Sequence, residues 1–144
     1  MTEVRELHAG ETALAFPALR ELRTHLTSVD ELVRRVDDVQ RPDGYRLVGA
    51  FEDGQEAAVA VAGFRAGNSL SWGRYLYVDD LVTREAARAR GHAGALTAWL
   101  VDEARRLGCE QLHLDSGSQR HDAHRFYLAH DLSISGFHFA RRVG

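Results

Sequence analysis

Arg88-Ala89-Arg90-Gly91-His92-Ala93-Gly94-Ala95-Leu96 follows a strand-like run, Leu70–Val82, and leads into a helical run, Ala93–Leu107. Most side chains in this stretch are very small or are arginines. Small side chains let a ligand approach the backbone, and the first amide hydrogens of a helix have no intrahelical acceptors. Arginine adds positive charge where phosphate oxygens would lie. The stretch therefore favours a pyrophosphate-binding turn, although close packing of a helix on a sheet would select the same small residues.

The helical run is the clearest element of secondary structure. Its apolar residues recur at helical spacing, and Gly108 follows it in the position of a C-terminal cap. Asp53-Gly54 and Gly67-Asn68-Ser69 are turn signals, and such turns favour hairpins. They separate three strand-like runs, Tyr45–Phe51, Gln55–Phe64 and Leu70–Val82. We expect an antiparallel meander followed by a crossover helix.

The N-terminal third of the sequence predicts a short strand, Val4–His8, and two helices. Thr12–Leu26 has the apolar spacing of a helix, in which Pro17 is tolerated only in the first turn or as a break. Ser28 followed by Glu31 three residues later fits a capping box and predicts the start of the second helix.

After the crossover helix, the sequence predicts a strand at Gln111–Leu114, a helix at Asp122–Leu128 and a final strand at Leu132–Arg141. A meander followed by a strand-helix-strand unit implies a mixed sheet with helices on both faces, an α/β fold of the α+β type. The sequence contains no internal repeat and no linker rich in Gly, Ser or Pro. We therefore expect one domain over residues 1–144.

The bulk properties exclude several classes of protein. With 144 residues and a net charge of -3, the chain lacks the basic balance of most nucleic-acid binders. Its longest uncharged apolar stretch, Ala57–Phe64, is far shorter than a membrane span. The start, Met1–Glu6, lacks the features of a leader peptide, so we expect a cytoplasmic protein without membrane or nucleic-acid partners. Cys109 is the single cysteine, which excludes an internal disulfide and a thiolate zinc cluster.

Two common phosphate-binding motifs do not fit the turn. A Walker loop ends in Gly-Lys followed by Ser or Thr, and a dinucleotide fingerprint needs three glycines in an N-terminal strand-helix-strand unit. The stretch instead resembles the acetyl-CoA signature of the GNAT superfamily of N-acetyltransferases, with Arg88, Gly91 and Ala93 at its fixed positions. Asp80-Leu81-Val82-Thr83 before the loop and Phe126-Tyr127 after the next strand are similar to two further motifs of that superfamily, in the same order.

The resemblance implies a GNAT fold with a mixed, mostly antiparallel sheet of six to seven strands and helices on both faces. It also implies acetyl-CoA as cosubstrate, with the loop amides of 90–95 on the pyrophosphate and the backbone of 81–83 on the pantetheine arm. An amide of Val82 or Leu81 would polarise the acetyl carbonyl. The residues implied in cofactor binding are Leu81, Val82, Thr83, Arg88, Ala89, Arg90, Gly91, His92, Ala93, Gly94, Ala95, Ser116 and Phe126.

Two residues match catalytic positions of the superfamily. Tyr127 matches the tyrosine that donates a proton to the CoA sulfur, and the alternative is a core aromatic with a hydrated hydroxyl. Asp80 matches a position where relatives often carry a glutamate as general base. Because aspartate is one methylene shorter, it would act through water, and Asp79 or Asp80 could instead orient the substrate ammonium.

The tract Arg120–Leu128 is similar to the aminoalkylphosphonate N-acetyltransferase type. Its His121 and His124, together with His138, could titrate, accept a proton, bind a metal or hold an acidic acceptor, and an N-capping or surface role is the alternative. No complete metal motif is present. The sequence departs from the superfamily where Ser116-Gly117 replaces an asparagine that contacts the cofactor, and where Asp131-Leu132 replaces Gly-Phe.

The sequence thus predicts an N-acetyltransferase that moves the acetyl group of acetyl-CoA to a primary amine of a small molecule by direct attack in a ternary complex. The alternative is a catalytically degenerate GNAT fold that binds or senses acyl-CoA. A generic α/β protein with a structural loop is a third hypothesis. The terminal strands offer an edge that could pair with a second subunit, which makes a homodimer possible.

Overall fold

The structure is a computed structural model that describes residues 2–144 and comprises two compact units, one ending at His113 and one beginning at Leu114. The expected single domain over residues 1–144 stays a prediction. None of the helices in residues 2–144 combines the length and apolar character of a membrane span. The main elements are β1 (Thr2–Leu7), α1 (Phe16–Leu22), α2 (Val29–Arg34), β2 (Arg46–Glu52), β3 (Ala60–Ser69), β4 (Gly73–Thr83), α3 (His92–Arg106), β5 (Gln111–Leu114) and α4 (His121–Ala129).

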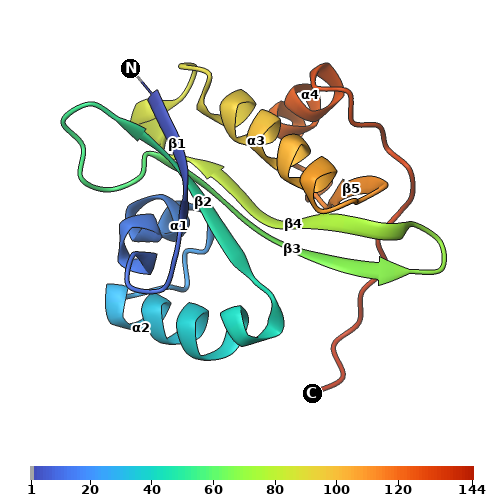
Figure 1. The fold of residues 1–144 in the computed structure, drawn as a ribbon, viewed down its shortest axis with the longest axis horizontal. Helices are drawn as coiled ribbons and strands as arrows, with labels where there is room; N and C mark the ends of the chain where they lie inside the picture. Colours follow the sequence, from blue (N-terminus) through green and yellow to red (C-terminus); the bar gives the residue numbers. More distant parts are fainter. Residues whose placement is uncertain (1) are drawn as a thin grey trace. The chain divides into compact units, whose positions relative to one another are not determined.

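The sheet has the order β1-β2-β3-β4-β5, and the first four strands form the expected antiparallel meander. In the first unit, α1 and α2 lie on one face of these strands and α3 lies on the other (Figure 1). Strand residues alternate between the two faces. Leu47 and Val61 belong to the buried cluster beneath α1 and α2, whereas Val48 and Ala62 point to the face that α3 covers. The predicted mixed fold with helices on both faces is confirmed.

A β-bulge interrupts β4 next to the candidate site. Asp80 pairs with Gly63 of β3 and Val78 pairs with Phe64, so Asp79 is an extra residue without its own partner in the register. In a regular strand, two consecutive side chains point to opposite faces, and one inserted residue shifts that alternation. Because of the bulge, both carboxylates lie on the face of the sheet that α1 and α2 cover.

The N-terminal helices begin as their sequences predict. The helical segment at Thr12 breaks at Pro17, which stands in the first turn of α1. At α2, the Ser28 hydroxyl oxygen accepts a hydrogen bond from the amide of Glu31 at 3.1 Å, and the Glu31 carboxylate accepts one from the amide of Thr27 at 2.9 Å. These bonds satisfy amide groups that a helix start otherwise leaves without acceptors.

Helix α3 ends at the glycine that the sequence predicts. Gly108 has a φ of +73°, which a residue with a side chain adopts only under strain. The amide of Cys109 donates to the carbonyl of Ala104 at 2.8 Å, and the amide of Gly108 donates to the carbonyl of Arg105 at 3.0 Å. This pattern is a Schellman motif, and it turns the chain toward β5.

Two predicted strand boundaries are wrong. The run Gln55–Phe64 becomes a strand only at Ala60, because the amide of Ala58 donates to the carbonyl of Leu14 at 3.0 Å and the preceding residues form a loop. The predicted turn 67–69 is part of β3, and the chain reverses at 70–72 instead. There the Ser69 hydroxyl accepts from the amide of Trp72 at 3.0 Å, and β4 starts at Gly73 rather than at Leu70.

The predicted final strand, Leu132–Arg141, is also wrong, and the sheet has five strands rather than six to seven. Residues 132–144 have no regular secondary structure. The side chains of Ile134, Phe137 and Phe139 are 75–91% exposed, so little apolar burial offsets the entropy cost of ordering this segment. Gly136 in its middle adds further backbone freedom.

A buried carboxylate connects α3 to the sheet. Glu103 accepts two hydrogen bonds from Arg106, both at 2.6 Å, and its Oε2 lies 2.6 Å from Nη2 of Arg46. Arg46 in turn donates two hydrogen bonds to Glu6, at 2.8 and 2.7 Å. The hydrogen bonds from Arg106, and then those from Arg46, lower the pKa of Glu103 to about 2.

We expect Glu103→Gln to lower the free energy of unfolding by about 1–3 kcal/mol at pH 7, because the partly buried Arg46 guanidinium loses a charged acceptor. Since the folded-state pKa lies below the ordinary value of 4.5, the stabilisation is complete above that value and is lost as the pH falls toward about 2. The melting temperatures of the wild type and of Glu103→Gln, measured between pH 7 and pH 2, should therefore become similar at the acid end of this range. Asp102→Asn on an exposed face of the same helix is the control, and a difference that stays constant across this range would contradict the assignment.

Candidate functional site

The loop between β4 and α3 is anchored at its start. The amide of Arg84 donates to the carbonyl of Val59 at 2.8 Å. Glu21 of α1 accepts a hydrogen bond from the amide of Glu85 at 2.8 Å and one from Nε of Arg84 at 3.4 Å. A short 3-10 turn, Glu85–Ala87, follows and buries Ala87. The loop therefore leaves the sheet along a fixed path toward α3.

The end of the loop presents backbone to solvent at the start of α3. Ala89 and Gly91 have positive φ values of 62° and 84°, a region that glycine adopts freely and alanine adopts at some cost. Gly91 is the residue before the helix and has no side chain to accept hydrogen bonds from the first amides. These amides, with the positive end of the helix dipole, are suited to bind an anion.

Two loop side chains are held by the end of β2. Glu52 accepts hydrogen bonds from Nη1 of Arg90 at 2.8 and 2.9 Å, and its Oε2 lies 2.7 Å from Nε2 of His92, which is 3% exposed. The hydrogen bonds from His92 and Arg90 lower the pKa of Glu52. Within residues 2–144, the Arg88 guanidinium has no hydrogen-bonding or ionic partner, and it borders an open depression of about 590 Å³. Arg88 is thus the loop arginine best placed for a ligand.

Within residues 2–113, the end of β4 beside this loop has no strand on its outer edge. The amide of Glu110 donates to the carbonyl of Arg74 at 2.7 Å, and the four residues of β5 follow from there. A strand of four residues starting beside Arg74 does not reach the end of β4 at Thr83. Within residues 2–113, the backbone of Asp80–Thr83 pairs only with β3 and leaves its other edge open to an extended ligand.

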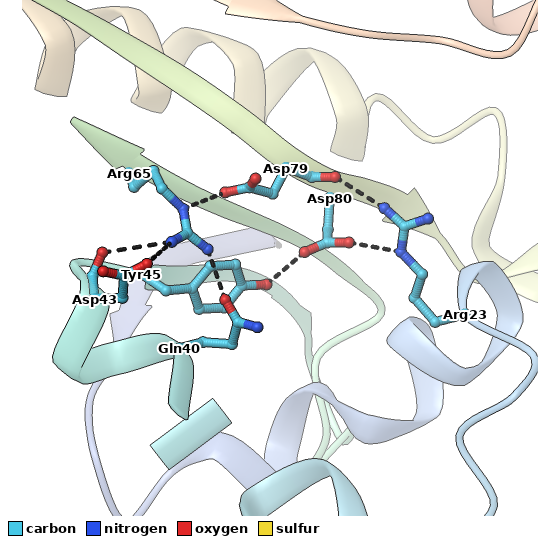
Figure 2. Close-up of polar contacts among 7 residues, drawn as sticks. All are labelled: Arg23, Gln40, Asp43, Tyr45, Arg65, Asp79 and Asp80. Atoms are coloured by element: carbon cyan, nitrogen blue, oxygen red, sulfur yellow. Dashed lines mark hydrogen bonds and ion pairs between the residues drawn. The ribbon is translucent and has the colours of Figure 1, made fainter. Parts of the chain in front are cut away.

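A network of charged side chains surrounds the bulge in β4 (Figure 2). Asp80, whose side chain is 14% exposed, accepts a hydrogen bond at each carboxylate oxygen. Nε of Arg23 donates to Oδ1 at 2.8 Å, and the Tyr45 hydroxyl donates to Oδ2 at 2.6 Å. Nη2 of Arg23 also donates to the backbone carbonyl of Asp79 at 3.0 Å. One guanidinium therefore bridges the Asp80 carboxylate and the Asp79 carbonyl.

The second carboxylate of the bulge has a different partner. Asp79 accepts a hydrogen bond from Nε of Arg65 at 2.9 Å, and Arg65 also donates to Gln40 at 2.7 Å and to Asp43 at 3.3 Å. Burial raises the pKa of Asp79, and the hydrogen bond from Arg65 opposes that rise. Three acceptors fix Arg65 in place, so this arginine is less free to move than Arg23.

Tyr45 stays protonated next to Asp80. Burial, followed by the charge of Asp80, raises the pKa of its hydroxyl well above the ordinary range. The hydroxyl lies over Gly63 of β3, where an added Cβ would come within 1.8 Å of it. Glycine at this position lets the tyrosine reach Asp80 from beneath the sheet.

Arg23, Tyr45 and Arg65 belong to the site but are not predicted from the sequence. Arg23 is 57 residues and Tyr45 is 35 residues from Asp80 in the chain, so no local spacing connects them. Gly63 inside an apolar strand was the available signal, because such a glycine marks a bulge or a close approach of other groups.

The remaining candidate residues lie in the unit that begins at Leu114. Tyr127 is half-buried on α4, and burial raises its pKa against the opposing effect of Arg120. Its ring meets that of Phe126 edge-on at a centroid distance of 5.7 Å. Oγ of Ser116 is buried and has no hydrogen-bonding partner within residues 2–144. Asp131 has a φ of +67°, as expected for an aspartate replacing glycine.

The histidines of this unit make separate contacts. Nε2 of His124 lies 2.8 Å from the carbonyl oxygen of Gly117, and the rings of His121 and His124 are 6.0 Å apart. Nδ1 of His138 lies 3.6 Å from Asp115. Among residues 2–144, no three His, Cys, Asp or Glu side chains gather in a way that could hold a metal ion.

Comparison with known proteins places the chain in a family. Residues 11–131 match the family model described as the acetyltransferase (GNAT) family. The chain belongs to the GNAT family. This GNAT protein is 34% identical over 128 residues to the uncharacterized N-acetyltransferase YhdJ of Bacillus subtilis, with 88% of each chain covered. It is 36% identical over 66 residues to the aminoalkylphosphonate N-acetyltransferase of Salmonella typhimurium, a match that covers 46% of this chain and 43% of the relative.

Solved structures share the GNAT fold. The ribosomal-protein-alanine N-acetyltransferase of Brucella melitensis biovar Abortus aligns with a TM-score of 0.83 at 20% identity, with 100% of both chains covered. AAC(6')-Iy, in complex with a bisubstrate analog containing CoA, aligns with a TM-score of 0.83 at 14% identity over 100% of this chain and 99% of the other. Family membership and the named relatives identify the protein as an acyltransferase.

Proposed function

We propose that this GNAT protein transfers the acetyl group of acetyl-CoA to a primary amine of a small molecule by direct attack in a ternary complex. The open edge of β4 at Asp80–Thr83 carries this proposal, because it runs directly into a loop that exposes the first amides of α3. An extended arm followed by a pyrophosphate matches these two features in that order.

The cofactor roles follow from this arrangement. The amides of 90–95 would hold the pyrophosphate, with the Arg88 guanidinium close by, whereas the side chains of Arg90 and His92 shape the loop through Glu52. The open backbone of Leu81, Val82 and Thr83 would pair with the pantetheine arm. An outward amide of Leu81 or Val82 would stabilise the negative charge that develops on the acetyl oxygen.

The chemistry requires a neutral amine and a protonated leaving group. The amine nitrogen attacks the thioester carbon, the new C–N bond forms and the C–S bond breaks. Tyr127 would donate its hydroxyl proton to the departing CoA sulfur, a role that suits a tyrosine whose raised pKa keeps it protonated at neutral pH. Asp80 would orient the substrate ammonium, which gives one proton to water before it attacks as a neutral amine. After the attack the nitrogen gives a second proton to water, and Tyr127 takes a proton from water to regain its hydroxyl.

One observation favours the degenerate alternative. Both carboxylate oxygens of Asp80 already accept hydrogen bonds, from Arg23 and Tyr45, so Asp80 has no free oxygen with which to deprotonate an amine. A protein that binds acyl-CoA without turnover would have the same cofactor features. The two hypotheses differ in thiol release, which only the enzyme produces.

A panel of amines tests the proposal. The relative named aminoalkylphosphonate N-acetyltransferase makes aminomethylphosphonate and 2-aminoethylphosphonate the first acceptors to try. Spermidine, kanamycin and a peptide with N-terminal alanine extend the panel to other primary amines. We expect CoA thiol release with at least one of these compounds, and release with none of them at saturating acetyl-CoA would favour the sensing module.

Binding of CoA should be visible without turnover. We expect CoA at 100 times its dissociation constant to stabilise the folded protein by about 2.7 kcal/mol, with a corresponding rise in melting temperature. Gly91→Ala should reduce this rise, because its φ of +84° is strained with any side chain and the first amides of α3 would shift. Gly136→Ala, with no strained φ and no atom within 4 Å of the added Cβ, is the control. An equal rise in all three proteins would exclude this loop as the binding site.

A further inference from the structure

Arg23 differs from the other charged groups around the bulge in β4. Its side chain is 46% exposed, whereas the Asp80 side chain beneath it is 14% exposed. The residue lies at the C-terminal end of α1, where the helix gives way to a non-helical connection to α2. Because nearly half of the Arg23 side chain is in contact with solvent, its ion pair with Asp80 contributes little to stability, and this guanidinium can leave Asp80 at little cost.

The other hydrogen bond to Asp80 comes from a buried donor, the hydroxyl of Tyr45. Tyr45 is 5% exposed, and its hydroxyl is confined between Gly63 and the carboxylate. Tyr45 therefore keeps holding Oδ2 when Arg23 departs from Oδ1. The carboxylate has one fixed donor and one exchangeable donor, so its orientation does not depend on Arg23.

We propose that the Oδ1 atom of Asp80 and the backbone carbonyl of Asp79 form the subsite for the acceptor's ammonium group, and that the Arg23 guanidinium occupies this subsite until an amine displaces it. This proposal rests on the proposed acetyltransferase function and adds to it the chemical class of group that Asp80 binds. Two oxygens that accept two N–H donors of a guanidinium, at 2.8 and 3.0 Å, can accept two N–H donors of an ammonium.

The charges around the subsite support a cationic occupant. Asp79, Asp80 and Asp43 carry negative charge there, and Arg65 is the cation that stays, because it is bound by Asp79, Gln40 and Asp43. The three carboxylates already outnumber the two guanidinium groups, and the excess of negative charge grows when Arg23 leaves. An incoming ammonium replaces the lost positive charge, which an anionic or neutral group would not do.

Kinetics with Arg23 variants test the proposal. The acceptors are 2-aminoethylphosphonate and propylamine, whose only charged group is its ammonium. At saturating acetyl-CoA, we expect Arg23→Gln to lower the KM for both amines about threefold, because the competing cation is removed. Arg23→Lys keeps a cation within reach and should stay close to the wild-type KM. Asp80→Asn should raise the KM for both amines about tenfold or more.

The control is Arg105→Gln, which removes an exposed arginine that lies 3.5 Å from Asp102 on α3, and it should leave all constants unchanged. A higher KM in Arg23→Gln for an aminophosphonate but not for propylamine would mean that Arg23 binds an anionic group of the acceptor, and would overturn the proposal. Unchanged KM values for both amines would overturn it as well.

Binding measurements separate this inference from the proposed function. Calorimetric titration of the same two amines into the CoA-loaded protein reports the affinity change without turnover. A protein that binds amines more tightly after Arg23→Gln but never releases thiol would support the subsite and refute the acetyltransferase function. Thermal melting and CoA affinity of each variant show whether the fold and the cofactor site are intact.

Discussion

Replacing Tyr127 with phenylalanine is expected to lower kcat by about 10²–10⁴-fold, the usual contribution of a general acid. The hydroxyl is the only group removed, and the CoA thiolate then leaves without a positioned proton donor. Because burial raises the pKa of Tyr127, the wild-type hydroxyl stays protonated throughout the neutral range and is ready to donate. The affinity for CoA should change little, since the cofactor contacts are assigned to the loop and to β4.

Steady-state rates and CoA titrations on the same preparations check this expectation. Tyr75→Phe, which removes a hydroxyl on β4 near the hairpin, is the matched control and should keep the wild-type kcat. Parallel losses of kcat and CoA affinity in Tyr127→Phe would mean that the ring supports the cofactor site and has no role as an acid. An unchanged kcat would assign the proton transfer to another group.

Gly63→Ala is expected to destabilise the fold by about 1–3 kcal/mol, the range for an overpacked core. The new Cβ would lie 1.8 Å from the Tyr45 hydroxyl, and the tyrosine has little room to move because it is 5% exposed. The displaced hydroxyl also loses Asp80, its hydrogen-bond acceptor. The same substitution should therefore lower the melting temperature and raise the KM for the amine, because Asp80 loses its fixed donor.

Chemical denaturation measures the free energy of unfolding of Gly63→Ala. The double variant Tyr45→Phe/Gly63→Ala tests whether the contact with Tyr45 causes the loss of stability. The phenylalanine lacks the hydroxyl, which has the closest contact, although Cζ would still lie 2.3 Å from the added Cβ. Each single variant loses the hydrogen bond to Asp80, and the double variant loses it only once, so it should lose less stability than the sum of the two single variants. Strict additivity would show that the backbone at the bulge, and not the tyrosine, makes glycine necessary at this position.

Local sequence signals predicted several elements of the first unit, including those of the proposed cofactor site. Gly91, Gly108 and the capping pair Ser28 and Glu31 act within a few residues of their own positions, so their spacing indicates their structure. The order of strands and helices in the first unit follows from the periodicity of apolar residues. The strand boundaries were less predictable, because bonds such as that from Ala58 to Leu14 join distant parts of the chain.

The acceptor side of the site could not be predicted in the same way. Asp79 and Asp80 read as an ordinary polar pair in an alternating strand, and only the register with β3 reveals the bulge that turns both to one face. Arg23, Tyr45 and Arg65 reach them from separate elements. The prediction of a final strand was wrong for a related reason. Leu132–Arg141 has the pattern of a strand, but its large apolar side chains are exposed.

The most direct test of the proposed acetyl transfer uses acetyl-CoA labelled in the acetyl group, with mass spectrometry of the amine and of the protein. We expect the label to appear as an amide on a primary amine, one for each CoA thiol released, with none on the protein. Labelled acetyl on a protein side chain would contradict direct attack. CoA binding without labelled product from any amine of the panel would contradict the transferase function itself.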